Sequence, residues 1–200
     1  MYLNRIFTRV LFSFYTGESL KVPNHELSPN DGNTMNPAEL VLAIVSNLPG
    51  QAVKGKKRLQ KLAFLLKEAG LRCNVRFEIR DYGPFSREVA SAANLLAAIG
   101  KISEIEEPVG ASHTFVTVYR IVSRSNDQAQ LADKYKKILA RLEAFSSIEL
   151  EVAATVQFYR SVGLSDASAK QRTIELKPTK ATPNVLKSVP KVLSSLAAPG

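Results

Sequence analysis

The stretch 56–69, KKRLQKLAFLLKEA, constrains the fold more than any other part of this sequence. Its apolar residues recur at the i, i+3, i+4, i+7 spacing of one helix face: Leu59, Leu62, Ala63 and Leu66. Gly70 follows as a helix stop. Because such a stripe is stable only against a core, we expect an amphipathic helix that packs inside a helical domain, with its polar side in water.

A second helix is predicted over 37–48. Asn36 can cap it, Pro37 suits the first helical position, and Glu39 stands where a capping box needs it. The Pro-Gly pair at 49–50 ends it.

Alternation of apolar and polar residues predicts a half-buried strand over 75–80, followed by a turn at Gly83-Pro84. Ser86 caps a third helix that runs to a buried Ile99. A β-hairpin is predicted near 101–122. Helical periodicity then marks 127–145, 147–162, 165–176 and 184–197. Pro190 is expected to break or kink the last of these helices.

This order of elements predicts a mostly helical α+β fold. Three helices and a hairpin suggest a winged-helix-like core, followed by a C-terminal helical section. We expect residues 35–200 to form a single helical domain. Residues 1–34 are predicted to be a flexible N-terminal extension, because 22–36 is rich in Pro, Asn and Gly and Met35 directly precedes a clean helix start.

Composition excludes several classes of protein. The chain has 200 residues, a net charge of +9, one cysteine and two histidines. No disulfide framework or structural zinc site can be built from that set, so we expect a cytoplasmic protein without metal or cofactor. No apolar run approaches the roughly 20 residues that span a membrane, and the apolar stretch near the N-terminus is too short for a secretory signal.

Most of the positive charge lies at 51–80, where nine basic residues face two acidic ones. One interpretation is a patch that neutralises phosphates. The other is a solvated helix face beside a solvated strand face. Basic residues at a helix N-terminus oppose the helix dipole, so an acidic group docked at Lys56, Lys57 and Arg58 would turn a small cost into a gain.

Sequence-specific DNA reading is disfavoured. The stretch between the second and third helices is too long for a helix-turn-helix and carries a strand. The third helix offers only Arg87 and Asn94 as base-reading side chains.

Two motifs carry a family resemblance: Arg58-Leu59-Gln60-Lys61-Leu62 on the basic helix, and Tyr82-Gly83-Pro84-Phe85-Ser86 before the third helix. Together with IELEVAATVQFYRSVGLS and LKPTKATPNVLKSV, they make residues 36–196 similar to the YwgA-like proteins, distant relatives of the Panacea (SocA-like) antitoxin domain. Pro190 and the N-terminal extension depart from the family pattern. The resemblance implies a small, mostly helical domain with no known catalytic site and, in the Panacea relatives, one that binds and neutralises a toxin.

Motifs for catalysis are missing from the sequence, which has no Gly-rich phosphate loop, no nucleophile elbow and no zinc-protease helix. Cys73 would need His113 as its base, and the histidine lies in the predicted hairpin loop. Glu104 and Glu106 share a strand face and could bind a metal, but a solvated strand face is the favoured interpretation. We therefore expect a protein that is not an enzyme.

The sequence predicts a non-enzymatic interaction or regulatory protein, antitoxin-like, that presents a basic helix edge to an acidic protein partner. The alternative is a nucleic-acid-binding protein that uses the same patch for backbone contacts. Tyr82 and Phe85 either plug the core or form a recognition turn. The predicted partner-binding residues are Lys54, Lys56, Lys57, Arg58, Lys61, Arg80, Tyr82, Gly83, Pro84 and Phe85.

Overall fold

The structure, a computed structural model, describes residues 34–110, 114–122 and 131–197 of the chain. These residues belong to one compact unit that spans Asn33–Gly200. The predicted flexible extension lies outside the described residues, apart from its last residue, and stays a prediction.

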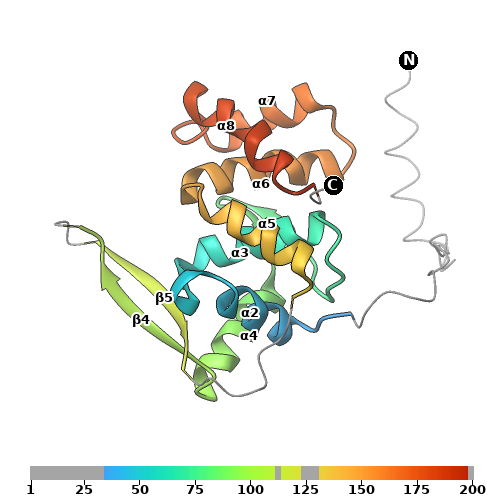
Figure 1. The fold of residues 1–200 in the computed structure, drawn as a ribbon. Helices are drawn as coiled ribbons and strands as arrows, with labels where there is room; N and C mark the ends of the chain where they lie inside the picture. Colours follow the sequence, from blue (N-terminus) through green and yellow to red (C-terminus); the bar gives the residue numbers. More distant parts are fainter. Residues whose placement is uncertain (1–33, 111–113, 123–130, 198–200) are drawn as a thin grey trace, which may run out of the picture. The chain divides into compact units, whose positions relative to one another are not determined.

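Helix α3 (Lys56–Glu68) lies at the centre of this unit (Figure 1). The helices that contact it are α2 (Pro37–Ser46), α4 (Arg87–Ala98), α5 (Asp133–Glu143) and α6 (Ser147–Ser161). The predicted apolar stripe is confirmed as buried. Burial extends further than the stripe, because every residue from Arg58 to Leu66 is buried. The basic helix is therefore enclosed on most sides, so its polar positions face protein as well as water.

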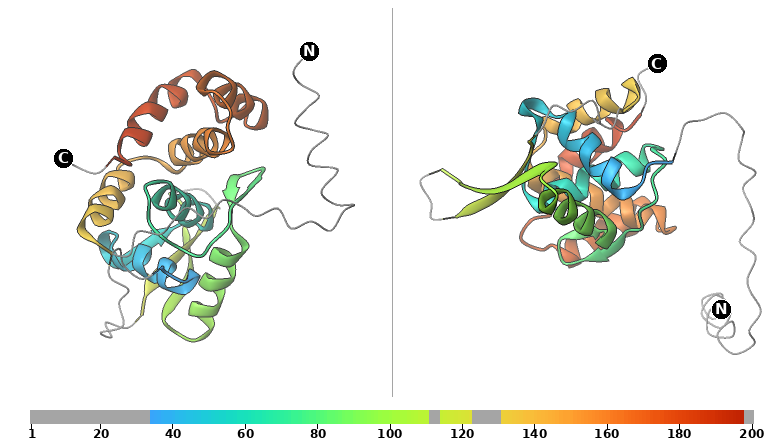
Figure 2. Two further views of the ribbon diagram at one scale, coloured as in Figure 1. Left: turned by 90° about the vertical axis from the view of Figure 1, so that its right-hand side faces the viewer. Right: turned by 90° about the horizontal axis from the view of Figure 1, so that it is seen from below.

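Three strands form an antiparallel sheet in the order β1–β5–β4: β1 (Ala52–Lys54), β5 (Phe115–Ile121) and β4 (Ile102–Pro108). The predicted hairpin is confirmed as β4–β5, and we call it the wing; it projects from the helical body (Figures 1 and 2). Strand β1 was not predicted. Two further short strands lie between α3 and α4; the rest of the order, α2, β1, α3, α4, β4, β5, contains the three helices and the hairpin that the sequence predicted.

Between α3 and α4 the chain forms a second small hairpin, β2 (Glu78–Arg80) paired with β3 (Gly83–Phe85). The predicted strand over 75–80 is thus shorter than expected, and the predicted turn supplies its partner strand. The segment between α3 and β2 forms a backbone hydrogen bond with the start of the domain. The Met35 N–H donates to the carbonyl of Arg72, which follows α3, at 3.0 Å.

In the C-terminal section, α7 (Asp166–Leu176) and α8 (Pro183–Ser194) pack on α6 (Figure 1). Pro190 was predicted to break or kink the last helix; it does not break it, because α8 runs through it. The neighbouring Val189 and Val192 are buried, so packing on α6 holds the helix together despite the missing backbone donor.

Local capping was predicted correctly. The Asn36 side chain accepts hydrogen bonds from the first turn of α2, and the Glu39 carboxylate accepts one from the Asn36 N–H. The Ser86 hydroxyl caps α4. Ile99 was predicted to be buried but is 59% exposed, because α4 ends one residue earlier and Ile99 is its C-cap.

The described residues form a mostly helical α+β fold with small antiparallel sheets, as predicted. Among them, no helix has both the length and the hydropathy that crossing a membrane requires.

Candidate functional site

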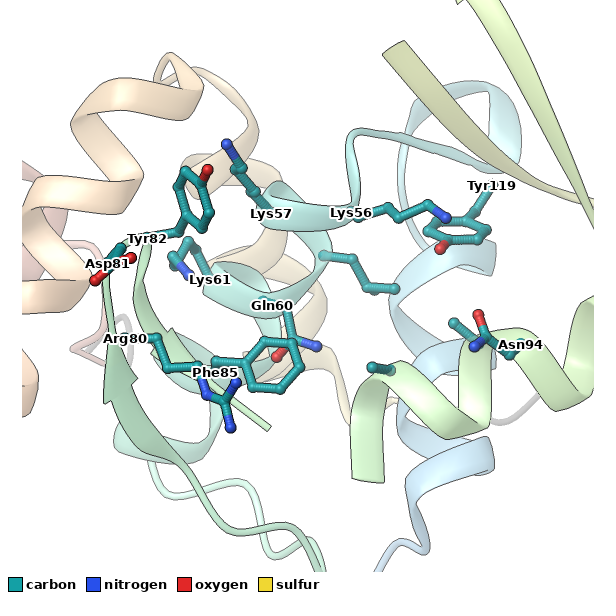
Figure 3. Close-up of a pocket in the computed structure, with 13 residues that line it drawn as sticks. Lys56, Lys57, Gln60, Lys61, Arg80, Asp81, Tyr82, Phe85, Asn94 and Tyr119 are labelled. Atoms are coloured by element: carbon teal, nitrogen blue, oxygen red, sulfur yellow. The ribbon is translucent and has the colours of Figure 1, made fainter. Parts of the chain in front are cut away.

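The first turn of α3 sends its two lysines in different directions. Gly55 precedes the helix at a φ of +108° and provides no side-chain cap. Its N–H donates to the carbonyl of Thr117 on β5 at 2.7 Å, which fixes the start of the helix against the wing. Lys56 then extends toward Tyr119, and Lys57 extends toward the β2–β3 hairpin (Figure 3). We call the basic residues between positions 54 and 61 the basic edge. The basic edge therefore has a wing side and a hairpin side.

On the wing side, cations meet acids of the same chain. Lys54 pairs with Glu107 at 3.5 Å, and Lys56 pairs with Glu104. The hydrogen bond that the Lys56 ammonium donates to the Glu104 carboxylate is the main cause of a raised pKa for Lys56. Both lysine side chains are more than half exposed, so each pair stabilises the fold by at most about 1 kcal/mol. These pairs form because β1 pairs with β5 and so lies near β4, which carries the glutamates.

Arg58 is buried, with only 8% of its surface exposed, which contradicts the expectation that it stands in water. Its guanidinium donates to the carbonyls of Phe145 and Glu143 and to the Glu143 carboxylate, at 2.9, 3.1 and 3.0 Å. These carbonyls lie at the C-terminal end of α5 and two residues beyond it, where a helix leaves backbone acceptors without partners. Arg58 therefore joins α3 to α5 and is not available to a partner.

Lys61 is buried as well, with 2% of its surface exposed, so the same expectation is wrong for it. Its ammonium donates to the carbonyl of Pro84 in β3 at 2.7 Å. The preceding residue, Gln60, exchanges two hydrogen bonds with the backbone of Ser86, at 3.0 and 2.9 Å. Consecutive polar side chains of α3 thus fasten the β2–β3 hairpin to the helix.

A second buried lysine holds the other end of the same hairpin. Lys177, which follows α7, donates to the carbonyl of Asp81 and to the Glu151 carboxylate, both at 2.7 Å. Lys180 donates to both carboxylate oxygens of Glu151 at 2.9 Å. Glu151 on α6 is therefore the shared counter-charge of two lysines from the segment between α7 and α8.

Gly83 lies against α6 and has a φ of +82°. A Cβ there would lie 2.5 Å from the hydroxyl of Thr155, and 3.5 Å from the Lys61 side chain. Gly83 and Pro84 are both buried. Gly83 therefore lies on the side of the hairpin that faces α6, whereas Arg80 and Tyr82 are exposed.

Between α3, α4 and the hairpin lies a pocket of about 460 Å³, which we call the hollow (Figure 3). Six of the predicted partner-binding residues line it: Lys56, Lys57, Lys61, Arg80, Tyr82 and Phe85. The other lining residues are Leu59, Gln60, Asp81, Ala90, Ala93, Asn94 and Tyr119. The structure thus brings together most of the predicted set. It leaves out Lys54 and Arg58, and it places Gly83 and Pro84 behind the hairpin.

Cations lie over aromatic rings at the rim of the hollow. The Lys57 ammonium is 3.4 Å from the centre of the Tyr82 ring, and that of Lys180 is 5.5 Å from it. Tyr82 is 52% exposed. The Arg80 guanidinium lies 5.0 Å from the centre of the Phe85 ring and also pairs with Glu78. These contacts leave the cations charged and near the surface, because a ring face attracts a cation without neutralising it.

The electrostatics of the hollow follow from burial. Burial lowers the pKa of Lys61 to about 7; Glu151 opposes the shift, and the ammonium groups of Lys177, Lys180 and Lys57 add to it. Burial also lowers the pKa of Lys177. For Glu151, burial acts to raise the pKa, but the hydrogen bonds from the two lysines outweigh it and the pKa is lowered.

The other candidates from the sequence are Cys73 with His113, and the glutamates of β4. Burial raises the pKa of the Cys73 thiol, which disfavours the reactive thiolate. His113, its proposed base, lies outside the described residues. Glu104, one of the proposed metal ligands, is paired with Lys56. Within the described ranges, no group of three or more histidine, cysteine or acidic side chains could hold a metal ion.

Sequence reasoning missed Glu151, Lys177 and Lys180, which support the hollow from behind. One signal was present: Glu151 stands between Leu150 and Val152, directly before the apolar residues Val152, Ala153 and Ala154 of α6. A carboxylate beside such residues is either exposed to water or, if it is buried, paired with a cation. The two lysines carried no local signal, because their burial depends on a contact with a helix more than twenty residues away.

No model of a known protein family matches this chain. The chain is similar to YwgA of Bacillus subtilis (strain 168), which is described as an uncharacterised protein. The two are 25% identical over 125 residues, covering 62% of this chain and 74% of YwgA. This similarity supports the YwgA-like part of the resemblance seen in the sequence and does not extend to the Panacea domain.

Proposed function

We propose that this chain is a non-enzymatic interaction or regulatory module that receives an acidic segment of a protein partner at the hollow. One observation carries the proposal: the cations around the hollow outnumber the acids that line it. Lys56, Lys57, Lys61 and Arg80 line it, while Asp81 is the one carboxylate among the lining residues. Lys56 and Arg80 pair with Glu104 and Glu78, which do not line the hollow, so Lys57 and Lys61 are the lining cations with no ion pair among the described residues. An acidic group placed there would supply the missing negative charge.

The rim has the residue types that dominate protein interfaces. Tyr82 and Arg80 belong to the two side-chain classes most enriched at interface hot spots, and both are exposed. The hairpin that carries them is held from behind by the buried lysines Lys61 and Lys177. A rim held in this way loses little conformational freedom on binding, which favours affinity.

Nucleic acid is the weaker alternative because of the wing. In a winged-helix protein that binds DNA, the wing and the third helix lie near phosphates. Here β4 carries Glu104, Glu106 and Glu107, which repel phosphates, and Arg87 is the one basic residue of α4. The charge pattern therefore favours an acidic protein segment over a nucleic-acid backbone.

The finer form of the proposal is antitoxin-like activity. It draws on the resemblance of the Leu-Gln-Lys-Leu and Tyr-Gly-Pro motifs to the YwgA-like proteins, whose distant relatives with a Panacea domain bind and neutralise a toxin. In this form, the acidic segment belongs to a toxic protein, and its capture at the hollow blocks the toxin.

The direct test measures binding of a fluorescein-labelled peptide of alternating glutamate and phenylalanine by anisotropy, near physiological salt. Lys57→Met and Arg80→Met are expected to weaken binding about fivefold or more, since interface hot spots contribute at least about 1 kcal/mol. Lys54→Met is the matched control. It removes the same charge from an exposed lysine that does not line the hollow, and it should leave binding unchanged.

A labelled DNA duplex is titrated in parallel. Tight DNA binding that weakens steeply with salt, and that Lys54→Met reduces as much as Lys57→Met, would favour the nucleic-acid alternative and contradict the proposal. For the antitoxin-like form, the products of adjacent genes are expressed with and without this chain. Growth arrest that wild type relieves and Arg80→Met does not is the expected result; no arrest from any of them would contradict it.

A further inference from the structure

The hollow is deeper and more apolar than capture of an acidic side chain requires. Its volume of about 460 Å³ falls in the range of small-molecule sites, roughly 300–1,000 Å³. Leu59, Ala93 and Phe85 line it together with the cations. Sites of this kind combine an apolar lining with a few polar groups that set orientation.

Three of its four lining cations lie toward one end. Lys57, Lys61 and Arg80 lie on the hairpin side of Gln60 (Figure 3). Lys56, which pairs with Glu104, lies at the other end with Tyr119 and Asn94. A ligand that spans the hollow would therefore meet most of the positive charge at one end, and an already paired lysine beside a neutral amide at the other. That polarity suits a molecule with an acid group on an apolar or planar body.

Lys61 is the most informative wall residue. An ammonium carries three N–H donors, and the hydrogen bonds of Lys61 within the described residues use one, on the carbonyl of Pro84. The side chain is buried, so bulk water solvates it poorly. A buried ammonium with unused donors at the wall of a pocket is stabilised by an anion in that pocket.

The charged groups around Lys61 further favour an anion in the hollow. The charged and titratable groups that face it are Lys57 of α3, Glu151 of α6, Lys177 and Lys180 beyond α7, and Arg80, Asp81 and Tyr82 of the hairpin. Glu151 already serves as counter-charge to two of these lysines. The neighbourhood thus keeps an excess of positive charge that the described residues do not balance.

From these observations we propose that the hollow binds a small organic anion, with its acid group at Lys57 and Lys61 and its apolar body against Leu59 and Phe85. This goes beyond the proposed function, because it needs no protein partner. The ligand would compete with an acidic segment for the same cations, so it would also regulate partner binding.

The test uses phenyl phosphate as the probe and follows backbone amides of the full chain by NMR. We expect saturable shifts at Leu59, Phe85 and Ala93. Inorganic phosphate supplies only the acid group and phenol only the ring. Each should bind at least about tenfold more weakly than phenyl phosphate. Lys57→Met should weaken phenyl phosphate about threefold, and the control Lys54→Met should leave it unchanged.

Lys61→Met should weaken binding about tenfold or more, because it removes a buried charged donor. If this variant fails to fold, the pH dependence of the wild type replaces it. The pKa of Lys61 is lowered to about 7 in the free protein, and a bound anion raises it, so binding takes up a proton. Between pH 7.5 and 9 a phosphate monoester keeps its charge, since its second pKa is about 6. Affinity should therefore fall at least about fivefold over that interval.

Equal binding of inorganic phosphate and phenyl phosphate, or equal loss in Lys54→Met and Lys57→Met, would overturn the inference. Absence of shifts at the hollow would overturn it too. If the acidic peptide still binds in that case, the inference fails alone and the proposed function stands.

Discussion

The two sides of the basic edge differ in the groups that their cations contact. On the wing side, Lys54 and Lys56 meet glutamates of β4. On the hairpin side, Lys57 meets a tyrosine ring, and Lys61 meets a backbone carbonyl. A run of like charges in a sequence can thus divide into a neutralised half and an open half, and the neighbouring strands decide which is which.

Burial separates the two sides further. The wing-side pairs are exposed and exchange readily with water, so they contribute little to stability. The hairpin side rests on a buried cluster in which Lys177 and Lys180 share the carboxylate of Glu151. The comparison therefore predicts that equivalent substitutions on the two sides have very different costs.

The largest difference is expected for the acids. Glu151→Gln leaves Lys177 buried beside Lys61 without a counter-charge, which should lower the free energy of unfolding by about 3–5 kcal/mol in urea titrations. Glu104→Gln removes an exposed counter-charge on the wing side and should cost at most about 1 kcal/mol. Similar losses in the two variants would contradict the assignment of a buried cluster.

The next effect concerns the hairpin. Gly83→Ala places a Cβ 2.5 Å from the Thr155 hydroxyl at a positive φ, and should destabilise by about 2–4 kcal/mol in thermal or urea unfolding. Gly100→Ala is the matched control: its φ is also positive, at +71°, but no atom lies within 4 Å of the new Cβ. The difference between the two variants isolates the clash, and a difference near zero would show that the hairpin does not press on α6.

A pH-dependent effect follows from Lys61. Its pKa is about 7 in the folded protein and 10.5 in an unfolded chain, so between these values the unfolded chain binds more protons. The free energy of unfolding contributed by Lys61 is lowest at and below pH 7, and it rises with pH up to 10.5, by at most about 1.4 kcal/mol per pH unit.

Urea unfolding of wild type and Lys61→Met at pH 7, 8 and 9 measures this effect. The stability of wild type relative to the variant should grow with pH. The lowered pKa of Lys177 acts in the same direction, but it is present in both proteins and largely cancels. A difference that is constant with pH would mean that Lys61 titrates normally.

The smallest effects are expected for the exposed lysines. Lys56→Ala, Lys54→Met and Lys57→Met should each change the free energy of unfolding by less than about 0.5 kcal/mol, because their side chains are solvated. Thermal melting is sufficient to check this. A large loss in any of them would show that the residue supports the fold, and its use as a binding variant would then be invalid.

Local rules were enough to predict much of the fold. The spacing of Leu59 and Leu62, the capping box at Asn36 and the hairpin at 101–122 are set by residues close in sequence, so each can be derived without knowing the rest of the chain. The buried set of α3 is an example: every predicted inward residue is buried.

The candidate site was less accessible to the same reasoning. Arg58 and Lys61 occupy polar positions of an amphipathic pattern, and only contacts 85–87 and 23 residues away in the sequence bury them. Their burial depends on where α5 and β3 pack, which local periodicity does not encode. Tyr82 and Phe85 were correctly brought near the basic helix, because the hairpin follows α3 after a short segment.

The most direct test of the account observes the lysine side chains themselves. NMR of the ¹⁵N-labelled ammonium groups, recorded during addition of the acidic glutamate–phenylalanine peptide, reports which lysines meet the anion. We predict that the ammonium signals of Lys57 and Lys61 shift. The signals of Lys54 and Lys56 should keep their positions, because both lysines already pair with glutamates of β4. Shifts that begin at Lys54 and Lys56, or that spread equally over all four, would contradict the division of the basic edge into a neutralised side and an open side.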